Sequence, residues 1–243
     1  MAIKAISFDF WHTLFIEQPG AFELYKRRRR SRLAEALFSC RDVAHTDLEH
    51  ACHVEAVAHN TIWREQHRTL AASERVKRIL AHLDVSLPDN ALAGLVETFE
   101  EGILEHPPIL VGRARAALET LSQRYRLAII SDVGFSPGRV LKRVIADHDL
   151  LELFDSLVFS DEAGRSKPHN DVFEITARTL GAAPDEIVHI GDLEYTDIVG
   201  AKQAGFHAIR FTGVTPIEDG ETTIADFVTD DLRDVARLVE LLG

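Results

Sequence analysis

Several side chains that can bind phosphate or a divalent metal follow short apolar runs of the sequence. They are Asp9, Ser131, Lys167, Asp192 and Asp197. The carboxylate of Asp9 can attack a substrate covalently, and with Asp192 it can supply the oxygen ligands that Mg²⁺ prefers. Lys167 and Ser131 can hold phosphate oxygens through charge and hydrogen bonding. These residue types together predict phosphoryl transfer.

The charges of these side chains depend on one another. Two neighbouring carboxylates repel, which favours the protonated form of one of them. A divalent cation between Asp9 and Asp192, with Lys167 alongside, removes that penalty and keeps Asp9 ionised at neutral pH. The sequence therefore predicts a magnesium-dependent site.

Buried strands of a parallel sheet are the elements that can bring these residues together. Apolar runs rich in branched side chains cover residues 3–10, 127–131, 157–160, 187–191 and 207–211. Helical patterns of crossover length lie between the later runs, at 111–123, 140–145, 171–180 and 197–204, and Gly205 then follows as a helix C-cap. This alternation predicts an α/β fold with a parallel sheet, whose ligands bind beyond the carboxyl ends of the strands.

The segment from about Phe22 to about Glu105 interrupts this alternation. It contains long helical patterns, and Pro88 and the pair Pro107-Pro108 punctuate it. We interpret it as an inserted helical domain. The expected boundaries are residues 17–105 for the insertion and residues 1–16 and 106–243 for the core, which ends with a helix over 230–242.

Four short motifs resemble, in order and spacing, those of the haloacid dehalogenase superfamily of hydrolases. The motifs are Asp9-x-x-x-Thr13-Leu14, Ile130-Ser131, Lys167-Pro168 and Gly191-Asp192-x-x-x-x-Asp197. The resemblance implies a Rossmann-like core with an inserted, all-helical C1-type cap. It also implies a phosphatase that acts on a small phosphorylated metabolite, through an aspartyl-phosphate at Asp9 that water then hydrolyses.

The same resemblance assigns roles to individual residues. Catalysis falls to Asp9, Ser131 and Lys167, and substrate binding to Ser131, Asp132 and Lys167. The expected Mg²⁺ ligands are Asp9, the main-chain carbonyl of Trp11, Asp192 and, from close by, Asp197.

Trp11 departs from the phosphatase pattern, which has a second Asp two residues after the nucleophile as general acid and base. General acid–base help is worth about 10²–10⁴-fold, so its loss would slow the hydrolysis of ordinary phosphate esters. His12 could shuttle the proton, since its side chain titrates near neutral pH, or it could be a turn residue that points elsewhere. A substrate with a good leaving group, such as an acyl phosphate, would need no acid.

Two alternative functions remain open at this point. An aromatic residue at position 11 resembles the 2-haloacid dehalogenase branch, in which Asp attacks carbon, but that branch needs no metal and usually lacks the Asp192 and Asp197 pair. Asp132 also stands where that branch prefers Asn. A third reading is a catalytically weak member that binds a ligand or partner, although such a protein has no physical need for a cluster of charges.

Composition narrows the range of partners. The chain of 243 residues has 27 Lys and Arg against 39 Asp and Glu, and the net charge of −12 would repel nucleic acid. No stretch approaches the roughly 20 apolar residues of a membrane span. Two cysteines, Cys40 and Cys52, are too few for a disulfide framework. We expect a cytoplasmic monomer or homodimer that binds a small anionic metabolite, neither nucleic acid nor membrane.

Five basic residues in succession, Lys26 to Arg30, fall in a predicted helix. Steps of about 100° per residue distribute such a run over every face, so at least one side chain faces inward. An inward Arg could grip a carboxylate or phosphate with two hydrogen bonds. The alternative is a solvated face whose long stems lie over apolar neighbours.

Overall fold

Two compact units make up the chain, and each is described by itself. The computed structural model describes residues 2–38, 43–218 and 220–243. The first unit contains Met1–Ile16, Ile109–Asp132 and Ile145–Gly243. The second contains Glu17–Pro108 and Val133–Val144.

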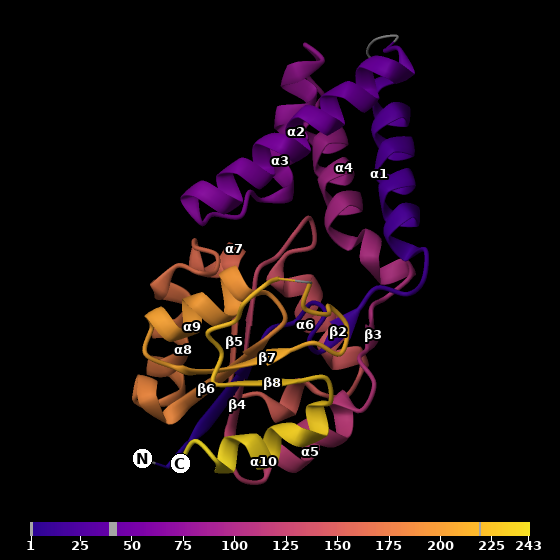
Figure 1. Cartoon of the computed structure of the whole chain (residues 1–243). Coiled ribbons are helices and arrows are strands. Elements are labelled where there is room, and N and C mark those ends of the chain that lie inside the picture. Colours follow the sequence, from indigo (N-terminus) through magenta and orange to yellow (C-terminus); the bar gives the residue numbers. More distant parts are fainter. Residues whose placement is uncertain (1, 39–42, 219) are drawn as a thin grey trace. The chain divides into compact units, whose positions relative to one another are not determined.

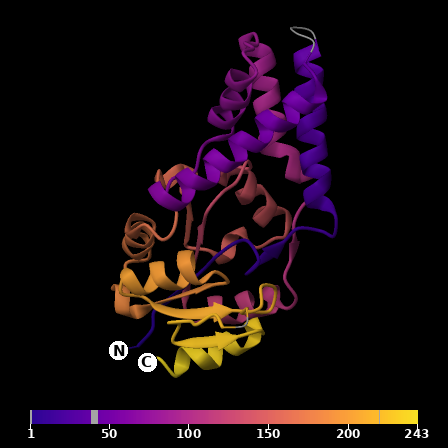
Figure 2. The ribbon, with the colours of Figure 1, turned by 45° about the horizontal axis from the view of Figure 1, so that its top comes forward.

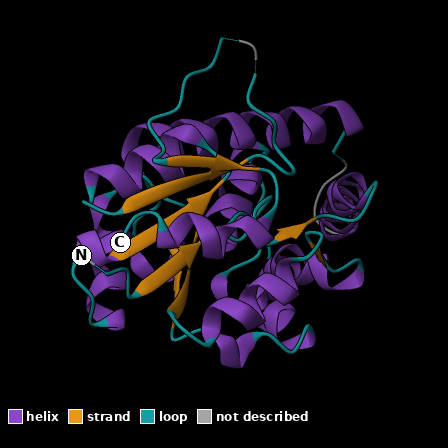
Figure 3. Cartoon of the chain, turned by 60° about the horizontal axis from the view of Figure 1, so that its bottom comes forward, coloured by secondary structure: helices purple, strands orange, loops and turns teal. Residues whose placement is uncertain are grey.

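A six-stranded parallel sheet forms the centre of the first unit (Figures 1 and 3). In spatial order its strands are β5 (Ser156–Phe159), β4 (Arg126–Ser131), β1 (Ala5–Phe8), β6 (Ile187–Gly191), β7 (His207–Phe211) and β8 (Phe227–Thr229). Chain order reverses beside β1, since β4 lies on one side of it and β6 on the other. The side chains that follow these two neighbours and β1 itself therefore meet at one edge. The predicted α/β class with a Rossmann-like parallel sheet is confirmed.

The strands form where branched and aromatic residues can be buried on both faces of the sheet. All four residues of β1 and all five of β6 are buried, as expected of a parallel sheet that helices cover on both sides. Strand β8 was not predicted, because three residues after a polar loop give no readable pattern. The antiparallel pair of β2 (Phe15–Ile16) and β3 (Ile109–Leu110) was missed for the same reason.

Helices cover the sheet in two layers. The helices of the first unit are α5 (Ala114–Ser122), α7 (Ser160–Ala163), α8 (Asn170–Leu180), α9 (Val199–Gln203) and α10 (Val235–Glu240), with a π-helical turn at Glu194–Ile198 before α9. Helix α8 packs with α9, and α5 packs with α10 (Figure 1). The C-cap of α9 is Ala204, and the glycine predicted as the cap, Gly205, follows it one position later in the left-handed conformation, with a φ of 83°.

Helices joined by short loops make up the described part of the second unit (Figure 2). It contains α1 (Ala21–Phe38), α2 (His45–Gln66), α3 (Ala72–His82), α4 (Asp89–Glu101), the 3₁₀ turn Gly102–Glu105 and most of α6 (Gly138–Asp147). Its core includes Leu33, Val76, Ile79 and Phe99.

The composition of the helical unit differs from the expected boundaries at two places. Residues 106–108 and residues 133–144, both expected in the core domain, group with the helices instead. The larger of the two is the segment 133–144. Phe135 explains its grouping, because its ring makes an edge contact with Phe99 of α4 at 5.2 Å and lies beneath two arginine side chains of α1 and α3.

The structure also describes the helices that could have spanned a membrane and one of the two cysteines. None of the helices in the described ranges has the length and apolar character needed to cross a bilayer. Cys52 is a half-buried free thiol, and burial raises its pKa to about 11. Cys40 lies outside the described residues.

Candidate functional site

A tight turn carries the chain away from the buried end of β1. The carbonyl of Phe10 accepts hydrogen bonds from the main-chain N–H groups of Leu14 and Phe15, at 3.1 and 2.8 Å. His12 lies at the tip with a φ of 57°, a left-handed conformation that favours glycine. The turn places the buried carboxylate of Asp9 at the carboxyl end of the sheet.

Lys167 joins two carboxylates at this edge. Its ammonium nitrogen lies 2.5 Å from Oδ1 of Asp9 and 2.5 Å from Oδ1 of Asp197. The side chain of Lys167 is only 3% exposed, so both contacts are shielded from solvent. Three residues that are far apart in the sequence thus form one charged cluster.

Asp197 is held by donors on both of its oxygens. Besides Lys167, Oδ1 lies 3.3 Å from Nε2 of His189, while Oδ2 accepts the N–H of Leu193 at 3.0 Å and the hydroxyl of Thr196 at 3.4 Å. The π-helical turn brings this side chain back over the end of β6.

Gly191 is what permits that approach. A Cβ atom at position 191 would lie 2.3 Å from Cγ of Asp197, a distance that atoms do not tolerate. The Gly191-Asp192 pair of the sequence motif therefore has a steric origin: only glycine leaves room for the Asp197 carboxylate.

Asp192 presents a carboxylate beside the cluster. Its Oδ2 accepts a 2.7 Å hydrogen bond from the hydroxyl of Thr215 and lies 3.7 Å from Nδ1 of His12. His12 therefore points toward Asp192, and not away from the site as the simple turn interpretation supposed.

The burial of these groups sets their pKa values. Burial raises the pKa of Asp9 well above its ordinary range, and the charges of Asp197 and Asp192 add to this effect against the opposing charge of Lys167. For Asp197 burial also opposes ionisation, but Lys167 and His189 outweigh it and hold the pKa well below its ordinary range. Burial opposes the charge of Lys167 too, yet Asp197 and Asp9 raise its pKa. Lys167 thus favours the ionised form of Asp197 over that of Asp9.

Ser131 and Asp132 lie at the end of β4, next to the cluster. The Ser131 hydroxyl donates to the carbonyl of Asp132 at 3.2 Å, and Oδ1 of Asp132 accepts the main-chain N–H of Lys167 at 2.9 Å. Asp132 therefore ties the segment that carries Lys167 to the end of β4, a positioning contact that the expected substrate-binding role did not include.

Trp11 lies on the same turn and supplies no acidic group. Its indole ring meets the ring of Phe10 edge to face at 4.9 Å and is partly exposed. The seven residues predicted for the site, Asp9, Trp11, Ser131, Asp132, Lys167, Asp192 and Asp197, all lie at the carboxyl ends of β1, β4 and β6 or in the segment after β5.

Three polar residues of this region were not predicted: Ser7, His189 and Thr215. His189 is fully buried in β6, with Nδ1 at 2.9 Å from the hydroxyl of Ser7 in β1 and Nε2 facing Asp197. Burial lowers the pKa of His189, which favours the neutral ring. A histidine in an otherwise apolar strand was a signal that could have identified it. Thr215 follows β7 in a polar loop and carried no signal.

The donor set of the site suits a small divalent cation. Carboxylate oxygens of Asp9, Asp192 and Asp197 lie within 4.8 Å of one another, and oxygen is the ligand type that Mg²⁺ prefers. Three carboxylates and one ammonium group leave two negative charges, which a divalent cation would balance. Since donors already occupy both oxygens of Asp197, Asp9 and Asp192 have the freer lone pairs.

Comparison with known proteins places this geometry in a family. Residues 3–205 match the family model of the haloacid dehalogenase-like hydrolases. A glyceraldehyde 3-phosphate phosphatase of Methanothermobacter thermautotrophicus is 31% identical over 127 residues, which cover 51% of this chain and 54% of the relative. One of Pyrococcus furiosus is 24% identical, with 67% of each chain covered. The chain thus spans about half to two thirds of the length of these relatives.

Solved structures share the fold over almost the whole chain. A 2-haloacid dehalogenase from Pseudomonas syringae superposes with a TM-score of 0.75 at 23% identity, covering 99% of this chain and all of the other. A HAD phosphatase from Thermococcus onnurineus gives 0.69 at 20% identity, with 98% of each chain covered. The motifs, the parallel sheet and the family match agree: the chain belongs to the haloacid dehalogenase-like hydrolases.

Proposed function

We propose that the chain is a magnesium-dependent phosphatase that acts on a small phosphorylated metabolite through an aspartyl-phosphate at Asp9. The observation that carries this proposal is the contact of Lys167 with both Asp9 and Asp197 beside the carboxylate of Asp192. The names of the relatives from Methanothermobacter and Pyrococcus support it.

The residues divide the reaction between them. An oxygen of Asp9 attacks phosphorus while the bond to the leaving-group oxygen breaks, and water then attacks the same phosphorus to release phosphate and restore the carboxylate. Lys167 and Ser131 hold the phosphoryl oxygens, and Lys167 also orients Asp9. Asp197 acts through Lys167 as a positioning residue.

A metal ion would complete the charge balance of the site. Asp9, Asp192 and the main-chain carbonyl of Trp11 would hold Mg²⁺, with Asp197 in support. When bound, the ion supplies positive charge that lowers the pKa of Asp9 and offsets the charge of the phosphoryl group. We further propose that the helical unit acts as a cap and sets substrate specificity.

Trp11 gives weight to a second candidate, hydrolysis at carbon. Because its indole cannot protonate an alkoxide, a substrate whose leaving group needs no proton fits the site better than an alkyl phosphate. Among phosphates this favours acyl phosphates, and outside phosphates it favours 2-haloacids.

A parallel turnover screen separates these candidates. The substrates are acetyl phosphate, an aryl phosphate, several sugar phosphates including glyceraldehyde 3-phosphate, and 2-chloropropionate, each with and without Mg²⁺, and Asp9→Asn is the blank. The proposal predicts magnesium-dependent phosphate release that is fastest for acetyl phosphate and absent from the blank. Metal-independent halide release without phosphate release would contradict it.

A further inference from the structure

The helical unit contains a second charged cluster that takes no part in the chemistry of Asp9. Its members are Arg29 of α1, Glu55 and His59 of α2, Arg75 of α3, and Phe135. Glu55 and Arg75 are both buried, at 4% and 6% exposure. Three helices and the segment 133–144 therefore bring charged groups into one interior region.

One of the two arginines in this cluster is paired and the other is not. Nε and Nη2 of Arg75 donate to the two oxygens of Glu55 at 2.7 and 2.9 Å, a bidentate ion pair. Arg29 has no carboxylate partner among the described residues, and its Nε is buried without a hydrogen-bond acceptor. Of the basic run Lys26 to Arg30, Arg29 is thus the side chain that turns inward without an acid to meet it.

Both guanidinium groups lie against the same aromatic ring. The Cζ atom of Arg75 is 3.5 Å from the ring centre of Phe135, and that of Arg29 is 4.3 Å from it, so the two Cζ atoms are less than 8 Å apart. When two guanidinium groups donate to one carboxylate or phosphate group, their Cζ atoms are separated by a distance of this order, since each N···O contact is about 2.9 Å.

His59 adds a second unsatisfied polar group. Its Nδ1 is buried without a hydrogen-bond partner in the described part of the chain. Burial and the charge of Arg75 lower the pKa of His59 to about 4, so the ring is neutral at pH 7 and can donate one N–H. Burial and the same arginine also lower the pKa of Arg29, to about 10, as expected of a cation that lies close to a second cation.

We infer that Arg29, Arg75 and His59 form an oxyanion-binding site that takes a carboxylate or phosphate group of a small molecule. Two guanidinium groups, one carboxylate and a neutral imidazole leave one positive charge, in a cluster where Glu55 and Arg75 are buried and Arg29 and His59 are half-buried. An anion would neutralise this charge and give the buried Nε of Arg29 the acceptor it lacks, because a buried donor without an acceptor is unfavourable. The site lies wholly within the helical unit, so the inference does not depend on the proposed function.

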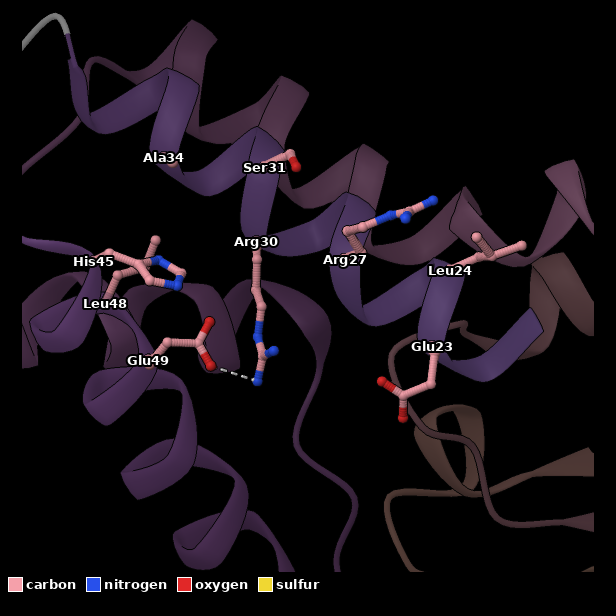
Figure 4. A pocket seen from close by; sticks show the side chains of 9 residues that line it. All are labelled: Glu23, Leu24, Arg27, Arg30, Ser31, Ala34, His45, Leu48 and Glu49. Atoms are coloured by element: carbon pink, nitrogen blue, oxygen red, sulfur yellow. Dashed lines mark ion pairs between the residues drawn. The ribbon is translucent and has the colours of Figure 1, made fainter. Parts of the chain in front are cut away.

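The arginines on the other side of α1 differ from Arg29, because they are either paired with an acid or exposed. A cavity of about 550 Å³ is lined by Arg27, Arg30, His45 and Glu49 among others (Figure 4). Arg30 there is already paired with Glu49 at 2.9 Å, and Arg27 is exposed. Arg27 is therefore the matched control for Arg29: it lies two positions away on the same helix and carries the same charge.

Anion binding tests the inference without turnover. Inorganic phosphate and malonate are titrated separately into the full-length chain, in magnesium-free buffer at constant ionic strength, by calorimetry and by thermal unfolding. We expect at least one of them to bind and to raise the melting temperature. Arg29→Gln should weaken this binding at least tenfold, whereas Arg27→Gln should leave it within twofold of the wild type.

The variants are chosen so that folding does not obscure the result. Arg29→Gln removes an unpaired cation and should unfold at the same temperature as the wild type, or higher. An Arg75 variant, in contrast, would leave the buried carboxylate of Glu55 without its cation and destabilise the fold. Arg29→Lys, which keeps the charge but loses the planar fork, should weaken binding too. No binding of either anion, or an equal loss in Arg27→Gln, would overturn the inference.

Discussion

The ammonium nitrogen of Lys167 lies 2.5 Å from Oδ1 of Asp9, in a region from which solvent is almost excluded. The same nitrogen contacts Asp197, so one cation serves two carboxylates. A nucleophilic Asp9 needs its negative charge, and Lys167 is the only cationic side chain of the described residues that the structure places against it.

Replacement of Lys167 by Met should therefore destabilise the protein as well as inactivate it. The change leaves Asp9 and Asp197 buried without their cation, and breaking such a pair costs about 3–5 kcal/mol. Urea unfolding at pH 7 measures the loss. The difference from wild type should shrink as the pH falls, because protonation of the two carboxylates removes the uncompensated charge.

A surface ion pair provides the control for this prediction. Lys202 lies 2.8 Å from Asp226 with both side chains partly exposed. Lys202→Met should cost only about 0–1 kcal/mol, as exposed pairs do. Equal losses for the two variants would mean that the buried cluster is not the reason for the effect of Lys167.

Magnesium should stabilise the folded chain, because a ligand bound only by the native state raises the midpoint of thermal unfolding. Asp192→Asn should abolish the rise, since this carboxylate has a free oxygen next to Asp9. Asp185→Asn is an exposed change of the same type and should keep it. A full response to Mg²⁺ in Asp192→Asn would refute the proposed metal ligands.

Trp11→Asp should restore a general acid. We expect kcat/KM for phosphate esters with poor leaving groups to rise about 10²–10⁴-fold, the usual worth of such a group. The rate with acetyl phosphate should change little, because that leaving group needs no proton. Trp11→Phe, which restores no acid, should leave both rates low; a gain of the same size in this variant would exclude the acid as its cause.

The pH dependence of stability should report on His59. Its pKa is about 4 in the folded chain, against about 6.5 for an ordinary histidine. Between these values the unfolded chain binds a proton that the folded chain does not, so stability falls as the pH drops from about 6.5 toward 4. The positive charge of Arg75 also disfavours protonation of the His59 ring, so it acts in the same direction as burial.

Denaturant unfolding in phosphate-free buffer at several pH values checks this. His59→Gln should flatten the slope in that window, and His53→Gln, an exposed change on the same helix, should not. If the slope were identical in wild type and His59→Gln, other groups would account for it.

The sequence identified most of the site because of one rule of parallel sheets. Asp9 and Asp192 each follow a strand and Ser131 ends one, and strands with the same direction end at the same edge. Thr215 and His189 were missed, since their contacts depend on how a loop and a strand pack, which periodicity does not report. Likewise, the basic run predicted that at least one of its side chains faces inward but not that Arg29 would be the residue without an acid.

Domain boundaries were less accessible from the sequence for a related reason. Residues 133–144 follow β4 directly and look like part of the alternating strands and helices. Their grouping with the helical unit rests on Phe135, whose neighbours Phe99 and Arg75 are remote in sequence. No local pattern encodes such a contact.

Mass spectrometry of the chain quenched in acid during turnover of acetyl phosphate with Mg²⁺ tests the central claim most directly. The proposal predicts one phosphoryl group on the peptide that contains Asp9, and none when Mg²⁺ is omitted or when Asp9 is replaced by Asn. Phosphate release that proceeds at the wild-type rate in Asp9→Asn, or a phosphoryl group found on another residue instead, would contradict it.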